Sequence, residues 1–344
     1  MRYVMLGSNG LRVSRVGQGT GQFGTPPWGY GTTFRRQDVF ETVDAAMRNG
    51  VNMFDTAETY GDGQSERLLG ACLQKYRRDD YVVVSKVAPW NLRYENVLKA
   101  ADRTLERMGL RYIDLYLVHY PNPLIRTRET FGALEKLVEL GKVRYIGTSN
   151  YHPIQLNKVI RALRNTELSV NEVEYNVVSR FSEKYTIPYC LRNKIGVIAF
   201  SPLAGGLLTG RYNSKSPPND RARAFNFLSN IGFIGRLERL LDVLKEIADK
   251  KGASISQIAL AWIASHRQCV PIPASLKPAE AEENAVAAEL FLSRSDLELI
   301  DKATPRVGLS RYVLDHYAVR PISWTKEALR VAYFSHPSAN SEDN

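Results

Sequence analysis

Residues 51–86 read VNMFDTAETYGDGQSERLLGACLQKYRRDDYVVVSK, two short apolar runs separated by an amphipathic stretch. Asn52–Asp55 and Tyr81–Lys86 have the length and composition of buried strands, and Gln64–Lys75 has the apolar spacing of a helix. Two strands joined through a helix form a βαβ unit, in which the strands are parallel and the crossover is right-handed. This stretch therefore predicts a parallel sheet covered by helices.

The same alternation continues along the chain in both directions. The predicted strands are Arg15–Gly19, Asn52–Asp55, Tyr81–Lys86, Ile113–His119, Val143–Ser149, Val170–Tyr175, Gly196–Ser201 and Cys269–Pro273. The predicted helices are Gln37–Arg48, Gln64–Lys75, Tyr94–Arg107, Arg128–Leu140, Pro153–Arg164, Glu183–Arg192, Arg236–Ala264 with a break near Gly252, Pro278–Ala287 and Ser295–Ala303. Eight such units close most naturally as an α/β fold of the (β/α)8 TIM barrel type, with a doubly wound open sheet as the competing topology.

The two ends of the chain lie outside this alternation of strands and helices. A β-hairpin is expected at the N-terminus, with Ser8-Asn9-Gly10 at its turn. Residues 1–306 are expected to form one barrel domain, and residues 307–344 a C-terminal extension whose end is flexible.

The composition is that of an ordinary globular protein, with 44% hydrophobic and 24% charged residues among 344. The three cysteines, Cys72, Cys190 and Cys269, form no CxxC pair, so neither a disulfide framework nor a metal site is expected and a cytoplasmic location is favoured. No signal peptide or membrane-spanning run is found. The formal charge of +10 is dispersed among acidic residues, which favours a solvated surface over a nucleic-acid or membrane partner.

A glycine pattern follows the first predicted strand. Residues 19–24, GTGQFG, match the GxGxxG pattern of Rossmann folds, which requires a helix to begin within the motif and hold a pyrophosphate at its N-terminus. The sequence continues TPPWGYGT, residues 25–32, which predicts a loop instead. We expect these glycines to let the loop backbone pass close to a ligand.

Four ionisable residues fall at or just beyond the predicted carboxyl ends of consecutive strands: Asp55, Tyr60, Lys86 and His119. In a barrel these ends meet at the catalytic face. Each residue alone has a structural alternative: a helix cap for Asp55, an edge lysine for Lys86, a surface aromatic for Tyr60 and a hydrogen-bonded core histidine for His119. Their occurrence in consecutive βα units favours a shared function.

These residue types suit the reduction of a carbonyl group by a hydride and a proton. An ammonium at Lys86 lowers the pKa of a nearby phenol, ordinarily ~10, so Tyr60 can act as a general acid. Asp55 would hold Lys86 in its charged form. His119 would orient the carbonyl oxygen by donating a hydrogen bond.

This set of residues resembles that of the aldo-keto reductase superfamily. The likeness runs from LGSNGLRVSRVGQGT (6–20) to about residue 305 and includes FDTAETYG (54–61), SK (85–86), GKVRYIGTSN (141–150), SPLAGGLLTG (201–210) and EEN (282–284). It is similar to the branch of bacterial general-stress reductases, aldose dehydrogenases and potassium-channel beta subunits. The resemblance implies an NAD(P)(H)-dependent oxidoreductase that interconverts aldehydes, ketones or sugar hemiacetals and their alcohols or lactones. A nicotinamide-binding regulatory subunit with low turnover is the alternative.

The resemblance also implies cofactor contacts on several loops, without a Rossmann fold. Ser149 and Asn150 would bind the carboxamide, with a helix N-cap as the alternative, and Phe200 would stack on the nicotinamide, with core packing as the alternative. The full set is Gly19, Thr20, Asp55, Ser149, Asn150, Glu172, Phe200, Ser201, Leu203, Gly205, Arg211, Lys277, Glu280, Glu283 and Asn284.

Several positions depart from the family pattern. Glu172 stands where the family usually has a glutamine, and a carboxylate there accepts hydrogen bonds but cannot donate. Ala274, Leu276 and Glu280 replace residues that bind the adenosine 2′-phosphate, and the Glu280 carboxylate would repel that group. Lys277 is the cation that remains in this segment. The balance favours NAD(H) over NADP(H).

The substrate, the reaction direction and the oligomeric state are left open by the sequence. Loops 120–127 and 205–233 and the tail after about residue 306 are expected to shape the substrate pocket. Trp28 and Trp90 are candidate apolar walls of that pocket, with plain packing as the alternative.

Overall fold

The structure is a computed structural model that describes residues 1–305, apart from residues 9, 214 and 217–230. Met1–Pro305 forms one compact unit. The predicted extension at 307–344, Asn9 of the predicted hairpin turn and part of the 205–233 loop lie outside the described residues.

Eight parallel strands form one sheet, in the order β10-β9-β8-β7-β6-β5-β4-β3. The strands are β3 (Gln18–Gly19), β4 (Met53–Asp55), β5 (Val82–Val87), β6 (Ile113–Val118), β7 (Val143–Ser149), β8 (Leu168–Glu174), β9 (Gly196–Phe200) and β10 (Cys269–Pro271). Every predicted strand is confirmed, with bounds that differ by three residues or fewer. The order along the sheet follows the order along the chain, as a barrel requires.

The first and last strands of this sheet are joined to each other. The Gly17 N–H donates to the Pro271 carbonyl at 2.9 Å, and the Gly19 N–H donates to the Pro273 carbonyl at 2.9 Å. A parallel bridge pairs Gly19 with Ala274. The sheet therefore closes on itself, which confirms the TIM barrel and excludes the open doubly wound sheet.

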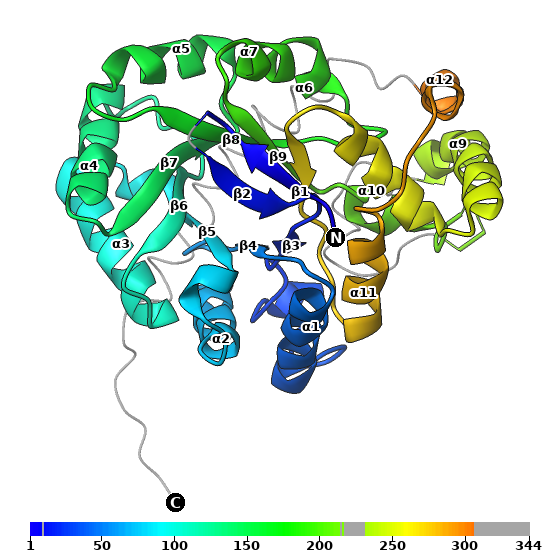
Figure 1. Ribbon diagram of the computed structural model, residues 1–344, viewed down its shortest axis with the longest axis horizontal. Helices are drawn as coiled ribbons and strands as arrows, with labels where there is room; N and C mark the ends of the chain where they lie inside the picture. The colour runs from blue at the N-terminus through cyan, green and yellow to red at the C-terminus, as the bar shows by residue number, and fades with distance from the viewer. Residues whose placement is uncertain (9, 214, 217–230, 306–344) are drawn as a thin grey trace, which may run out of the picture. The chain divides into compact units, whose positions relative to one another are not determined.

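Helices surround the strands (Figure 1). The α-helices are α1 (Arg36–Arg48), α2 (Gln64–Leu73), α3 (Tyr94–Met108), α4 (Thr127–Glu139), α5 (Pro153–Ala162), α6 (Phe181–Lys184), α7 (Thr186–Arg192), α9 (Ile231–Lys251), α10 (Ile255–Ser265), α11 (Pro278–Val286) and α12 (Arg294–Ala303). Short 3-10 helices are η1 (Pro26–Trp28), η2 (Arg78–Asp80), η3 (Pro89–Asn91) and η4 (Ala204–Thr209).

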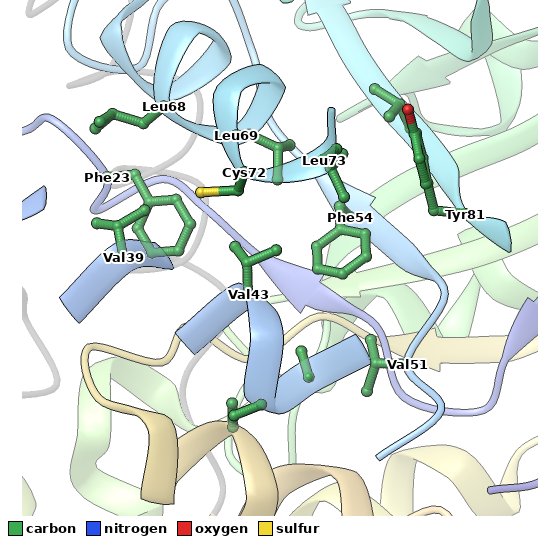
Figure 2. Close-up of a cluster of buried hydrophobic side chains, with 14 of the residues drawn as sticks. Phe23, Val39, Val43, Val51, Phe54, Leu68, Leu69, Cys72, Leu73 and Tyr81 are labelled. Carbon is green, nitrogen blue, oxygen red and sulfur yellow. The ribbon is translucent and has the colours of Figure 1, made fainter. Parts of the chain in front are cut away.

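The helices pack against the barrel through apolar side chains. Figure 2 shows one such cluster, in which Val43 of α1, Phe54 of β4 and Leu69 and Leu73 of α2 are fully buried together. Burying one side chain of this size contributes about 1.5–3 kcal/mol. The apolar spacing that predicted α1 and α2 is therefore the spacing of their barrel-facing residues.

The N-terminal hairpin closes one end of the barrel. It consists of β1 (Tyr3–Leu6) and β2 (Leu11–Ser14), which pair antiparallel, and in Figure 1 it lies across the strands. Leu6 and Leu11 are buried in the same cluster as Val170 of β8 and Ile198 of β9. Leu6 lies against Gly196, the first residue of β9, so the hairpin covers the end where the strands begin. A functional site is therefore expected at the opposite end of the barrel, where the strands end.

Three local differences from the predicted elements have simple causes. The 181–192 region holds two helices, because Tyr185 leaves the helical conformation between α6 and α7. The predicted break near Gly252 is confirmed, since Gly252 is left-handed with φ 60° and Ser254 then caps α10 by accepting from the Gln257 N–H. Residues 19–24 form no helix, as predicted, and the predicted loop at 25–32 holds only the short 3-10 helix η1, since α1 begins at Arg36.

Gly19→Ala is expected to destabilise the barrel, because a Cβ there would lie 2.8 Å from the Ile272 carbonyl oxygen. Separating β3 from the segment that follows β10 costs about 1–3 kcal/mol. Gly132→Ala is the matched control, since a Cβ at that position of α4 meets no atom within 4 Å. Alanine in place of a helical glycine stabilises by about 0.5–1 kcal/mol. Denaturant unfolding measures both changes, and wild-type stability of Gly19→Ala would contradict the close approach.

Candidate active site

A buried ion pair lies at the carboxyl ends of β4 and β5. The Lys86 ammonium is fully buried, and its Nζ is 2.5 Å from Oδ1 of Asp55, the last residue of β4. The same Nζ donates to the Thr56 carbonyl at 3.0 Å. Because an unpaired ammonium is costly to bury, these acceptors are what allow Lys86 to remain charged inside the barrel.

Tyr60 reaches this ion pair from the loop after β4. Its Oη lies 3.4 Å from Lys86 Nζ, and the ammonium is 5.2 Å from the centroid of the tyrosine ring. The loop after β3 also lies against this ring, since a Cβ at Gly21 would lie 3.7 Å from it. The predicted trio of Asp55, Tyr60 and Lys86 therefore forms one continuous set of contacts.

His119 borders the same space from the end of β6. Its ring is 5.7 Å from the Tyr60 ring at an interplanar angle of 85°, and it stacks on Tyr120 at 5.1 Å. Its Nδ1 is 3.3 Å from Thr59 Oγ1, and its backbone carbonyl accepts from the Asn150 side-chain amide at 3.1 Å. The structure thus brings all four predicted residues to one end of the barrel.

The electrostatics of Tyr60 differ from the sequence-based expectation. Burial raises the pKa of Tyr60 above its ordinary value, and the charge of Lys86, which lowers this pKa, does not outweigh it. The carboxyls of Asp55 and Glu172 raise the pKa of Tyr60 further. The pKa of Lys86 is itself raised, because the attraction of Asp55 and Glu172 exceeds the opposing effect of burial. Lys86 is therefore a firmly charged neighbour of a protonated phenol.

The residues expected to contact the carboxamide lie next to this set. Ser149 ends β7 and is paired with Glu172 of β8, while the Asn150 N–H donates to the Glu172 carbonyl at 2.8 Å. Asn150 has a left-handed φ of 65°, and its side-chain amide also donates to Ser149 Oγ at 3.0 Å. Gly19 and Thr20 lie at the end of β3, where the Thr20 hydroxyl donates to the Asp55 carbonyl at 2.8 Å.

The remaining cofactor candidates follow β9 and begin α11. Phe200 ends β9 and packs partly against the barrel cluster, so core packing accounts for part of its burial. Ser201 has a left-handed φ of 51°, and Leu203 and Gly205 continue into η4. Arg211 follows this segment, and its Nη2 is 3.6 Å from Glu280 Oε1 on α11.

The start of α11 is held by its own acidic residues. Glu280 Oε2 accepts from the Leu276 N–H at 2.7 Å, which fixes the carboxylate beside the backbone that leads into the helix. Lys277 is the exposed N-cap residue. Glu283 accepts from Ser254 Oγ at 2.5 Å, and the buried Asn284 amide donates to Ser275 Oγ at 3.1 Å. Glu283 and Asn284 therefore also connect α11 to its neighbours.

Two residues beside the site, Glu58 and Thr59, were not found by sequence reasoning. Glu58, in the loop after β4, accepts from the Ala88 N–H at 2.7 Å and from the Asn91 amide at 3.0 Å, so it ties this loop to the one after β5. Thr59 meets His119 as described above. An acidic residue inside FDTAETYG was visible in the sequence, but nothing in the pattern separated it from a solvated loop residue.

The cysteines take no part in the site. Cys72, Cys190 and Cys269 are free and buried, and burial raises the pKa of each thiol to about 12. The thiols are therefore protonated near neutral pH and are poor nucleophiles. Within the described part of the chain, no helix combines the length and the apolar character that crossing a membrane requires. The cytoplasmic location stays a prediction.

Comparison with known proteins gives a consistent picture. A family model described as the aldo/keto reductase family matches residues 15–305. The uncharacterized oxidoreductase Rv2298 of Mycobacterium tuberculosis is 36% identical over 320 residues, which cover 92% of this chain and 97% of the relative. The methylglyoxal reductase YeaE of Escherichia coli is 32% identical over 294 residues, covering 84% and 94%. The solved aldo-keto reductase from Klebsiella pneumoniae in complex with NADPH has a TM-score of 0.71 and 28% identity, covering 89% and 96%.

Lys86→Met is expected to lower the free energy of unfolding by about 3–5 kcal/mol near pH 7, because two buried carboxyls lose their cation. Lys86 lowers the pKa values of Asp55 and Glu172, so its removal raises both. A carboxyl whose pKa is raised on folding contributes stability that is present below its unfolded-state pKa and is lost as the pH rises. The deficit of Lys86→Met should therefore be smaller at about pH 5 than at about pH 8.

Lys142→Met is the matched control for this experiment. Lys142 pairs with Asp102 at 2.5 Å on the surface, where both side chains are exposed. Breaking an exposed pair costs less than about 1 kcal/mol, with little dependence on pH in this range. An equal loss of stability in the two variants would contradict the importance of burial at Lys86.

Proposed function

This chain belongs to the aldo/keto reductase family, and on that premise we propose that it transfers a hydride between a nicotinamide dinucleotide and a carbonyl or alcohol substrate, with Tyr60 as general acid and base. The observation that carries the proposal is the continuous set of contacts from Asp55 through Lys86 to Tyr60. The bound cofactor supplies the hydride. The chain's own residues supply the proton and the orientation of the substrate.

The backbone geometry of the barrel end supports a bound cofactor at this position. Asn150, Ser201 and Ala204 are three of the six described non-glycine residues with a left-handed φ, and all lie at the carboxyl ends of β7 and β9. Strained backbone of this kind concentrates at binding sites. Ser149 and Asn150 would hold the carboxamide, the η4 segment and Arg211 the pyrophosphate, and Lys277 to Asn284 the adenosine end.

Proton transfer falls to Tyr60. Its hydroxyl lies 3.4 Å from the Lys86 ammonium, which stabilises the phenolate that remains when the proton is given to a carbonyl oxygen. Asp55 keeps Lys86 oriented through its 2.5 Å contact. His119, whose ring borders Tyr60, would donate to the same oxygen in its Nε2–H form and so fix the carbonyl between two donors.

The rim of the site favours substrates with apolar surface. Trp28, Trp90 and Leu124 are 40%, 47% and 90% exposed on the loops after β3, β5 and β6, at the same barrel end as Tyr60. These side chains offer apolar walls to a ligand. We propose small aldehydes and ketones as the substrate class. The methylglyoxal reductase among the relatives makes methylglyoxal a first test compound, beside sugars in the oxidative direction.

We propose NAD(H) as the preferred cofactor. Glu280 is fixed beside the Leu276 backbone, which places a carboxylate in the segment that would face an adenosine 2′-phosphate. The ion pair with Arg211 partly offsets the charge of Glu280. The exposed ammonium of Lys277 would instead attract the phosphate. The Klebsiella pneumoniae relative is in complex with NADPH and therefore does not support a preference for NAD(H). The proposed preference rests only on the residues of this chain named above.

Tyr60→Phe is expected to reduce the rate of carbonyl reduction by ~10²–10⁴-fold, because only the proton donor is lost. Cofactor affinity, followed by fluorescence titration, should stay at the wild-type value. Tyr185→Phe is the control, since Tyr185 is half-exposed between α6 and α7, where its ring contacts Phe181. A folded Tyr60→Phe protein with full activity would show that the proton comes from another group.

Glu280→Arg is expected to narrow or reverse a preference for NADH over NADPH, because a guanidinium replaces repulsion by a charge-assisted contact with the phosphate. Dissociation constants for both reduced cofactors measure this, and the effect should weaken with added salt. Glu282→Arg makes the same charge change on the exposed side of α11 that faces Arg48, at 3.7 Å, and should leave the preference unchanged. Tighter binding of NADPH by the wild-type protein would mean that Lys277 governs the segment.

A further inference from the structure

Two carboxyls share the single ammonium of the site. Asp55 and Glu172 are each 2% exposed, and Lys86 is fully buried between them. They belong to β4 and β8, which are separated in the sheet by β5, β6 and β7. The two carboxyls therefore approach each other across the interior of the barrel.

The hydrogen bonds of Lys86 are already assigned to other groups. An ammonium has three N–H donors. Three acceptors receive hydrogen bonds from Nζ: Asp55 Oδ1 at 2.5 Å, the Thr56 carbonyl at 3.0 Å and Tyr60 Oη at 3.4 Å. Glu172 Oε2 lies equally far from Nζ, at 3.4 Å, but in a geometry that makes no hydrogen bond. An ionised Glu172 would thus be attracted to the ammonium without being hydrogen-bonded to it.

Two buried carboxyl oxygens lack a hydrogen-bond partner among the described residues. Within the part of the chain that the structure describes, Asp55 Oδ2 and Glu172 Oε2 have no donor while both groups are ionised. Two carboxylates and one ammonium also leave a net negative charge in an interior that solvates charge poorly. A proton placed between the two oxygens removes both problems, since one oxygen then donates and the other accepts.

We propose that Glu172 is a positioning residue that is held as a carboxylic acid near neutral pH and donates its proton to Asp55 Oδ2. Lys86 then faces one carboxylate, and the set of Asp55, Lys86 and Glu172 is electrically neutral. The proton resides on Glu172 because Asp55 has the shorter contact with the ammonium, which favours the anionic form of Asp55. The inference concerns the charge of these side chains and does not depend on the role assigned to Tyr60.

The direction of the pKa shifts agrees with this arrangement. Burial, followed by the charge of Asp55, raises the pKa of Glu172 well above its ordinary value, and Lys86 does not offset them. A side-chain hydrogen bond between the two carboxyls raises the pKa of Glu172 and acts to lower that of Asp55, as expected when Glu172 is the donor. The two groups titrate as a pair.

Among the described residues, few other titratable groups surround Glu172. Asp55 on β4, Lys86 on β5 and Tyr60 in the loop after β4 are the ones that interact with it. The neighbouring strands place Ser149 and Ile198 beside it, and neither titrates in this range. The acid form also offers a donor as well as an acceptor, whereas a carboxylate can only accept.

Infrared spectroscopy of the full chain without added cofactor, near pH 7, tests the proposal directly. The wild-type protein should show the C=O stretching band of a buried carboxylic acid, shifted in D₂O, and Glu172→Gln should lack it. Labelling with ¹³C in glutamate side chains should shift the band, whereas labelling in aspartate side chains should not. Glu183→Gln is the control, because Glu183 pairs with Arg180 and has a pKa lowered to about 2, so its loss should leave the band unchanged.

Two results of that experiment would overturn the proposal. Identical spectra of wild type and Glu172→Gln in the carboxylic-acid region would mean that Glu172 is ionised. A band that follows the aspartate label would place the proton on Asp55.

The pH dependence of unfolding gives a second, independent measurement. A proton held by folded but not unfolded Glu172 makes the folding equilibrium constant fall about tenfold per pH unit above the unfolded-state pKa, until Glu172 titrates in the folded protein. This part of the decline should be absent from Glu172→Gln. Parallel stability curves for the two proteins between about pH 5 and pH 8 would contradict a proton bound at Glu172.

Discussion

The burial of one ammonium is the constraint on which the catalytic end of this barrel depends. Lys86 is fully buried, and an uncompensated charge at that depth would cost several kcal/mol, so its neighbours must supply acceptors. Asp55 provides one from the strand itself. The loop after β4 bends so that the Thr56 carbonyl and the Tyr60 hydroxyl reach the same Nζ. The position of Tyr60 is thus partly a consequence of solvating Lys86.

The topology of the sheet makes that solvation possible. Parallel strands deliver their carboxyl ends to one side, and the contacts of Gly17 and Gly19 with the segment after β10 close the ring. Closure is what brings Glu172 of β8 to the ion pair formed by β4 and β5. An open sheet with the same strand order would keep neighbours such as Asp55 and Lys86 together but would separate both from Glu172.

The sequence predicted well the features that depend on local pattern. Strand and helix positions follow from apolar spacing, and Asp55, Lys86 and His119 were found because each stands at the end of its strand. The features it missed depend on distance in space. Nothing in the sequence shows that Glu172 meets Asp55 across the barrel or that Glu280 accepts from the Leu276 N–H. The effect of Lys86 on Tyr60 was predicted with the right sign, but the burial that outweighs it could not be counted before the fold was known.

The pKa of Tyr60 depends on the charges that surround its hydroxyl. Lys86 lowers the pKa of the phenol, whereas burial, Asp55 and Glu172 raise it. A donor with a strongly raised pKa gives up its proton reluctantly, so each negative charge nearby opposes the reduction of a carbonyl. A glutamic acid that keeps its proton leaves one carboxylate to balance one ammonium. It therefore brings the pKa of Tyr60 closer to the range in which a phenol can both give and recover a proton.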